Sequence, residues 1–156
     1  MKNSIKKIVI FSSGLFLGIT LLAQSTQNAE PANTELSLVK TTEDADLKWG
    51  PCPSFMPNGC SIAVLHGDPG KKNSEVFFKV QADSNIPSHW HNSAERMILI
   101  SGVLEVIYEG QKPQTLRAGS YAFGPSKKAH SAKCADSGPC ILFIAFEEPL
   151  DAFPKG

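Results

Sequence analysis

The stretch HWHNSAERMILISG, residues 89–102, places two histidines two positions apart, a glutamate four positions further on and a glycine seven beyond that. Side chains at i and i+2 of a strand project from the same face, so His89 and His91 are expected to point together. Glu95 follows the turn-like segment NSA, where the chain can reverse and begin a second strand with a carboxylate on the same side. Imidazole and carboxylate groups bind transition metals, so this stretch predicts part of a metal site.

The chain from Leu47 to about Phe146 consists of short apolar runs cut by Gly, Pro, Asn and Asp. These runs predict strands at 61–65, 75–82, 88–91, 95–100, 103–108, 114–117, 120–123, 130–133 and 141–146. No internal repeat and no sustained helical period accompany them. Many short strands at regular spacing indicate an all-β sandwich or barrel.

The first 23 residues differ from the rest of the chain. Lys2, Lys6 and Lys7 precede an uncharged apolar run at 8–22, and a small residue follows at Ala23. This pattern predicts a signal peptide at 1–23 and export to the periplasm or beyond. The alternative is an uncleaved membrane anchor, but the run is shorter than the roughly 20 residues that span a bilayer. Residues 24–44 are expected to form a flexible lead-in, and 45–156 a single domain.

The charge of the chain excludes two classes of partner. Its 15 basic and 15 acidic side chains balance, and removal of residues 1–23 takes away three lysines, which leaves a net charge of −3. Neither nucleic acid nor, after signal cleavage, an anionic membrane is therefore expected as a partner.

The four cysteines form two short-range pairs in the sequence, Cys52 with Cys60 and Cys134 with Cys140. Exported proteins keep disulfides, and both pairs bracket turn-like segments, so local bridges are favoured. Four cysteines allow three pairings, and the sequence does not choose among them. A zinc site is the other interpretation, although the usual CxxC spacing is absent.

Two motifs of the chain resemble those of the cupin superfamily. The first motif is G, five residues, HxH, three or four residues, E, six residues, G, and it matches at His89, His91, Glu95 and Gly102. The second is G, five residues, PxG, two residues, H, three residues, N, and it matches at Gly119, Pro125 and His130. Three positions depart from the pattern, where Asp83, Lys127 and Cys134 replace Gly, Gly and Asn. None of the three removes a predicted metal ligand.

The resemblance implies a small conical, jelly-roll-like β-barrel. It implies a divalent transition metal (Fe, Mn, Ni, Cu or Zn) bound by His89, His91, Glu95 and His130. Apolar side chains such as Met97 and Leu99 would surround the ion. A small molecule is the expected ligand or substrate, and dimers are common in the family.

The side chains around the predicted ligands are expected to be structural. By strand alternation Trp90 and Arg96 should face away from the metal. His66, Ser93 and Lys128 are expected at exposed turns, whereas Tyr121 and Phe123 are expected to pack.

Three functions fit this site. The first is a metal-dependent oxygenase or a related enzyme acting on a small organic molecule, with the metal as Lewis acid. The second is a non-enzymatic, metal-dependent binding module, and the third is an isomerase or epimerase. The sequence identifies no catalytic residue, since Glu95 could serve as a base only if it left the metal.

Overall fold

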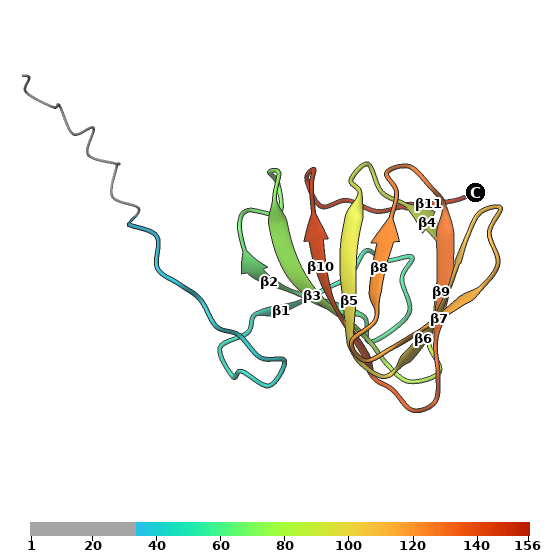
Figure 1. Ribbon diagram of the computed structural model, residues 1–156, viewed down its shortest axis with the longest axis horizontal. Helices are drawn as coiled ribbons and strands as arrows, with labels where there is room; N and C mark the ends of the chain where they lie inside the picture. The colour runs from blue at the N-terminus through green and yellow to red at the C-terminus, as the bar shows by residue number, and fades with distance from the viewer. Residues whose placement is uncertain (1–33) are drawn as a thin grey trace, which may run out of the picture. The chain divides into compact units, whose positions relative to one another are not determined.

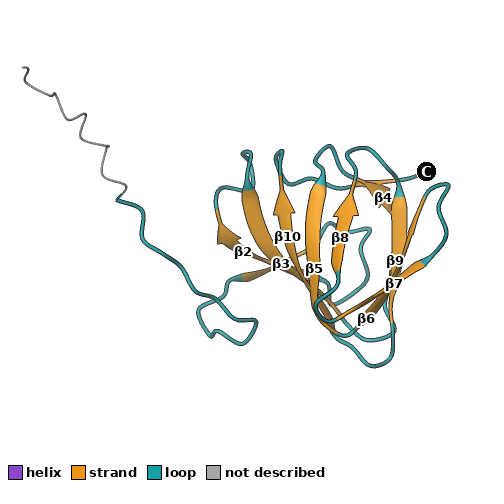
Figure 2. Ribbon diagram, viewed as in Figure 1, coloured by secondary structure: helices purple, strands orange, loops and turns teal. Residues whose placement is uncertain are grey.

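The computed structural model describes residues 34–156, and strands and loops account for all of them (Figure 2). Residues 38–156 form one compact unit. The predicted signal peptide and residues 24–33 of the predicted lead-in lie outside the described residues. In the part of the chain that is described, no helix is long and apolar enough to cross a membrane.

Eleven strands make up the domain (Figure 1). They are β1 (Trp49–Pro51), β2 (Ser61–His66), β3 (Ser74–Val80), β4 (Asn85–Trp90), β5 (Glu95–Ser101), β6 (Val103–Tyr108), β7 (Gln114–Arg117), β8 (Tyr121–Gly124), β9 (His130–Cys134), β10 (Cys140–Phe146) and β11 (Phe153–Pro154). One antiparallel sheet has the order β1-β2-β3-β10-β5-β8, and the other has the order β11-β4-β9-β6-β7. The predicted all-β jelly-roll barrel is confirmed.

Each predicted strand is present, with shifts at the ends. The largest shift is in β4, which begins at Asn85 instead of Ser88 and ends before His91. β1 and β11 were not predicted, because each has only two or three residues and contains a proline. Such short segments show no alternation, and they are strands only through their pairing with β2 and β4.

Alternation in β5 separates the interior of the barrel from its outer face. Glu95, Met97 and Leu99 are buried, whereas Arg96 and Ile98 between them are exposed. Met97 lines the central cavity as expected, but Leu99 lies in the core without reaching it. The burial of Glu95 therefore follows from the period of the strand that begins with it.

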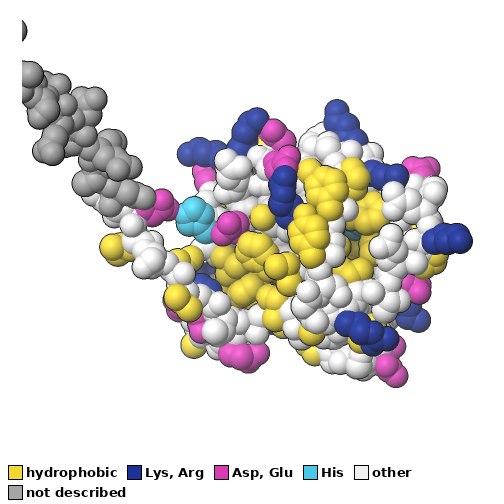
Figure 3. All heavy atoms as spheres, in the orientation of Figure 1, with side chains coloured by type: hydrophobic (Ala, Val, Ile, Leu, Met, Phe, Trp, Pro, Cys, Tyr) yellow, Lys and Arg dark blue, Asp and Glu magenta, His cyan; other side chains and the backbone are white. Residues whose placement is uncertain are grey.

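The outer face of β5 and β8 is apolar, and here the expectation for two aromatic residues was wrong. Tyr121 and Phe123 do not pack into the core, since they are 63% and 49% exposed. They pair with Ile98 and Arg96 on β5. Figure 3 shows hydrophobic side chains gathered on this face of the domain. β8 alternates, and the buried face of this short strand belongs to Ala122 and Gly124 instead.

Trp90 and Arg96 do point away from the interior. Trp90 stacks on Phe153 of β11, with ring centroids 4.6 Å apart. Arg96 is exposed and forms an ion pair with Glu147. His66, the last residue of β2, is exposed as expected.

The four cysteines are joined in local pairs, as Cys52–Cys60 and Cys134–Cys140. Such bridges are typical of proteins from oxidising compartments. Next to the second bridge, Gly102 has a φ of +82°, and a Cβ there would lie 2.9 Å from the Sγ of Cys140. The motif glycine after β5 is therefore required both by its backbone conformation and by close packing.

Candidate metal centre

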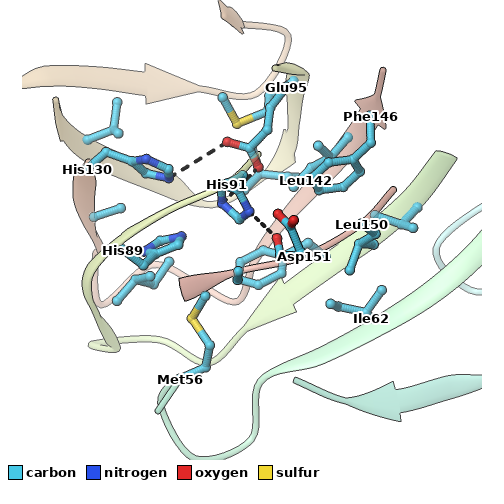
Figure 4. A pocket seen from close by; sticks show the side chains of 18 of the residues that line it. Met56, Ile62, His89, His91, Glu95, His130, Leu142, Phe146, Leu150 and Asp151 are labelled. Atoms are coloured by element: carbon cyan, nitrogen blue, oxygen red, sulfur yellow. Dashed lines mark hydrogen bonds and ion pairs between the residues drawn. The ribbon is translucent and has the colours of Figure 1, made fainter. Parts of the chain in front are cut away.

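The structure brings the four predicted ligands together at one end of the barrel (Figure 4). His89 lies near the end of β4, and His91 follows one residue after that strand. Glu95 begins β5 and His130 begins β9, where it pairs with His89. Ends of three strands, from both sheets, therefore supply the site. We call His89, His91 and His130 the histidine cluster.

The histidine cluster has the spacing of a metal site. One ring nitrogen of each histidine lies within 4.8 Å of those of the other two. The Nε2 atoms of His91 and His130 lie 3.4 and 3.8 Å from the two carboxylate oxygens of Glu95. Metal–nitrogen bonds are about 2.0–2.1 Å long, so a small contraction would bring the three nitrogens within bonding distance of one ion.

In every ring of the histidine cluster, the second nitrogen atom, Nδ1, contacts a backbone carbonyl oxygen. The Nδ1 of His89 lies 2.7 Å from the oxygen of Pro87, and that of His130 lies 3.2 Å from the oxygen of Lys128. The Nδ1 of His91 contacts the oxygen of Asp151. A carbonyl only accepts hydrogen bonds, so each Nδ1 must carry the proton. In the neutral rings Nε2 then has a free lone pair, as a metal ligand requires.

Local sequence accompanies one of these carbonyl contacts and also shapes the turn before His130. Proline cannot donate to a sheet ladder, and the pairing of β4 with β9 shifts its register between Ile86 and His89, on either side of Pro87. This irregularity accompanies the contact of the Pro87 carbonyl with the His89 ring. Lys127 has a φ of +59°, and its N–H donates to the carbonyl of His91 at 2.7 Å. The turn that precedes His130 thus keeps its form although lysine replaces the motif glycine.

Burial keeps His89 and His130 neutral. His89 and His130 are 3% and 8% exposed. Desolvation lowers the pKa of His89 to about 4, and together with the neighbouring His89 it lowers the pKa of His130 to about 3. At neutral pH His130 is therefore uncharged, so its contact with Glu95 is not a salt bridge. Neutral imidazoles can bind a cation without first losing a proton.

Glu95 is fully enclosed, and its burial raises the pKa of the carboxyl group, an effect that nearby His91 opposes. A buried carboxylate without a full counter-charge is costly. A divalent cation among the three histidines would supply that charge. The donor set of three imidazoles and one carboxylate therefore fits a divalent metal.

A cavity of about 70 Å³ adjoins the four side chains. Apart from the four predicted ligands, Tyr108 and Asp151, its lining is apolar, and none of the described residues that line it is Lys or Arg. Met56, from the loop closed by the first disulfide, and Leu150, from the C-terminal segment, also line it. The space can hold an ion with a small ligand, and any anionic ligand would depend on the metal for its counter-charge.

Sequence reasoning missed three residues at the site. Asp151 contributes the carbonyl that holds His91, and its carboxylate accepts hydrogen bonds from the backbone and side-chain nitrogens of Asn92 at 2.9 and 2.7 Å. Ser93, expected to be exposed, is 1% exposed, and its hydroxyl accepts hydrogen bonds from the N–H groups of Glu147 and Glu148. Nothing in the local sequence marks these long-range contacts.

Tyr108 is the third missed residue, and alternation in 103–108 could have found it. It follows the buried residues Leu104 and Val106 on β6, lines the cavity and pairs with His130 on β9. Its ring lies 4.8 Å from the ring of His130. Desolvation and nearby Glu95 raise the pKa of the Tyr108 phenol well above its usual range.

Two antiparallel sheets closed around a buried histidine cluster define a cupin. Residues 38–149 match the model of the ChrR cupin-like domain, and the chain belongs to this family.

Known proteins similar to this chain include enzymes. The dimethylsulfoniopropionate lyase DddQ of Ruegeria pomeroyi is 25% identical over 97 residues, which are 61% of this chain and 48% of the lyase. The chain thus spans about half the length of this curated relative. The crystal structure of the same lyase aligns with a TM-score of 0.61 and 21% identity, over 70% of this chain and 63% of the lyase chain.

The polyketide cyclase RemF of Streptomyces resistomycificus aligns with a TM-score of 0.61 at 14% identity, over 76% of this chain and 87% of its own. At such identities the structural likeness establishes the shared fold alone.

Proposed function

We propose that this protein is a metal-dependent cupin that binds a small organic molecule at a divalent transition metal. The ligands would be His89, His91, Glu95 and His130. The observation that carries the proposal is the set of backbone carbonyl contacts made by the rings of the histidine cluster. All three Nδ1 atoms contact backbone carbonyls, so three Nε2 lone pairs are available beside a buried carboxylate.

A buried cluster of this kind has no evident role in stability. Placing three imidazoles and a carboxyl group in an apolar interior costs free energy unless they are paired. A bound metal would offset this cost and would leave coordination positions open for the small molecule. When bound, such an ion supplies Lewis-acid chemistry, which lowers the pKa of a ligand attached through oxygen.

The residues of the chain would then bind and shield that ligand. The apolar side chains of the cavity, among them Met97, Phe146 and Leu150, exclude water from it. Exclusion of water strengthens the electrostatic interactions of the site. The favoured ligand has an oxygen-bearing head for the metal and a small apolar body.

We propose Lewis-acid catalysis on such a molecule as the reaction class. The related lyase, by its name, acts on dimethylsulfoniopropionate, which is a small organic molecule. An oxygenase, the expectation from cupin resemblance, has no separate support. Parallel assays of dioxygen uptake and of substrate loss by NMR, with dimethylsulfoniopropionate and a panel of phenols and dicarbonyl compounds, distinguish these reactions.

A metal-dependent binding module is the second candidate. One observation favours it, which is the scarcity of groups for acid–base catalysis. Apart from the proposed ligands, the titratable groups of the lining are Tyr108 and Asp151, and the carboxylate of Asp151 is engaged by Asn92. Thermal stabilisation of the metal-loaded protein by a compound that is not converted supports this candidate.

The deciding experiment measures bound metal. The protein from Gln24 onward, without a histidine tag, is expected to contain about one transition metal ion per chain by elemental mass spectrometry. Absence of metal after purification and after reconstitution would reject the proposed function. The identity of the bound metal would narrow the reaction class, because iron, nickel and copper support reactions with oxygen, whereas zinc does not.

Export and dimerisation are also proposals. The basic start, the apolar run and the two disulfides support export. The exposed apolar face around Ile98, Tyr121 and Phe123 supports a homodimer. Cell fractionation tests the first proposal, and light scattering in solution tests the second.

A further inference from the structure

Tyr108 places a polar group in the cavity that the fold does not use. The residue is 7% exposed, and its Oη has no hydrogen-bond partner among the described residues. A buried hydroxyl without a partner lowers the stability of a fold. The three histidine rings beside it, in contrast, all have a carbonyl partner. A phenylalanine would fill the same space without this cost.

Gly124 marks where the hydroxyl lies. A Cβ on Gly124 would be 2.5 Å from Tyr108 Oη and 3.0 Å from Glu95 Oε2. Gly124 is not among the residues with positive φ, so its backbone conformation does not require glycine. The missing side chain instead leaves room for the phenol oxygen beside the carboxylate. Tyr108 Oη and Glu95 Oε2 therefore both lie near the space that a side chain at position 124 of β8 would fill.

The hydroxyl is on the side of the cluster where His130 lies. Glu95 Oε2 is the carboxylate oxygen nearer to His130, at 3.8 Å from its Nε2, and the Tyr108 ring contacts the ring of the same histidine. Although the carboxylate is close, Tyr108 makes no hydrogen bond to it. The hydroxyl is thus unpaired beside the carboxylate, and it belongs to a residue that lines the cavity at the edge of the histidine cluster.

We infer that Tyr108 is a ligand-binding residue whose hydroxyl donates a hydrogen bond to an oxygen atom of the small molecule bound at the histidine cluster. This inference rests on the proposed function and specifies its ligand. Since no Lys or Arg is among the described residues that line the cavity, Tyr108 is proposed as the neutral hydrogen-bond donor to the ligand. The preferred ligands are small carboxylates, enolates and hydroxamates with two adjacent oxygen atoms, one for the metal and one for Tyr108.

The test compares two probes on the metal-loaded protein by isothermal titration calorimetry. Acetohydroxamate offers two oxygen atoms, whereas imidazole binds a metal through nitrogen and has no oxygen. Tyr108→Phe should weaken acetohydroxamate binding about tenfold, the value of one hydrogen bond to a charged acceptor, and leave imidazole binding unchanged. Tyr121→Phe is the matched control, because it removes the same hydroxyl from an exposed site.

Two further measurements exclude a merely structural role. Tyr108→Phe should bind the metal as tightly as the wild type, and its melting temperature without metal should be equal or higher, because the lost hydroxyl has no partner. Gly124→Ala should weaken acetohydroxamate binding as well, since its Cβ would lie 2.5 Å from the hydroxyl and force it to move.

Failure of the inference is separable from failure of the proposed function. Unchanged acetohydroxamate affinity in Tyr108→Phe, with normal metal content, overturns the inference alone. A parallel loss of metal affinity also overturns it, because Tyr108 would then act by positioning Glu95. A wild-type protein that takes up no metal overturns both.

Discussion

The two ends of the barrel contain the same strands but different chemistry. At one end β9 begins with His130 and β5 with Glu95, and the buried groups are polar. At the other end β9 closes with Cys134, which is bridged to Cys140 at the start of β10, and both are fully buried. The cysteine end has the features of a stabilised fold, namely a covalent bond and close packing.

The histidine end has features that cost stability, such as desolvated rings and an unpaired phenol. The difference supports the proposal that the histidine end binds a metal and a ligand, whereas the cysteine end stabilises the barrel.

The largest expected effect is at the histidine end. His89→Ala/His91→Ala removes two of four proposed ligands, so metal affinity should fall at least about 100-fold, by the general effect of losing metal ligands. Metal content by elemental mass spectrometry is the measurement, and His66→Ala, an exposed histidine outside the cluster, is the control. A double variant that keeps its metal would show that the two ends do not differ in the way described.

Removal of the disulfides is expected to have the next largest effect. The two bridges should differ in whether their loss also weakens ligand binding. Removal of either bridge by Cys→Ala pairs should lower the free energy of unfolding by roughly 2–3 kcal/mol, because both close short loops. Only loss of Cys52–Cys60 should also weaken binding of acetohydroxamate, since its loop carries Met56 to the cavity. Urea denaturation and calorimetry check the two parts. Equal effects of both bridges on binding would contradict the assignment of separate roles.

Acid should destabilise the metal-free protein through the histidine end. The pKa values of His89 and His130 in the folded state, about 4 and about 3, lie below the unfolded value of 6.5. The unfolded chain therefore binds protons first as the pH falls. Stability from these histidines is complete above pH 6.5 and is lost as the pH falls towards 4 and below. Glu95 has the opposite effect, because its pKa is raised in the folded state. The stability that this carboxyl group contributes to the fold is lost as the pH rises.

The expected loss between pH 7.5 and pH 5 is about 2 kcal/mol per histidine at most. Urea midpoints in the presence of a chelator measure it. His89→Gln/His130→Gln should flatten the profile, and His66→Gln should not. A profile that is unchanged in the cluster variant would show that these rings are not the buried neutral groups described.

The smallest effect concerns the turn before His130. Lys127→Gly should raise the free energy of unfolding by up to about 1 kcal/mol, because glycine adopts the positive φ of this position without a steric cost. Asp83→Gly is the comparison, and it should gain less because aspartate tolerates this conformation. Thermal unfolding measures both changes. Altered metal content in Lys127→Gly would instead give the lysine a role at the histidine end.

Much of the fold and the residues of the candidate site could be predicted from the sequence. Short apolar runs cut by turn residues predict strands because burial has a period of two, and β5 follows this rule from Glu95 onward. Strand alternation predicted that His89 and His91 point together, the resemblance to the cupin motifs added His130, and the structure brings these residues together.

Tertiary structure alone decided which atoms hold and surround the cluster. Asp151 contacts His91 across 60 positions of the chain, and Ser93 accepts hydrogen bonds from Glu147 and Glu148. The approach of Tyr108 on β6 to the clear space at Gly124 on β8 depends on how the two sheets face each other. The alternation of apolar and polar residues predicts which face of a strand is buried. It does not predict which distant backbone carbonyl will contact a histidine ring, because the distance between the two groups depends on closure of the barrel.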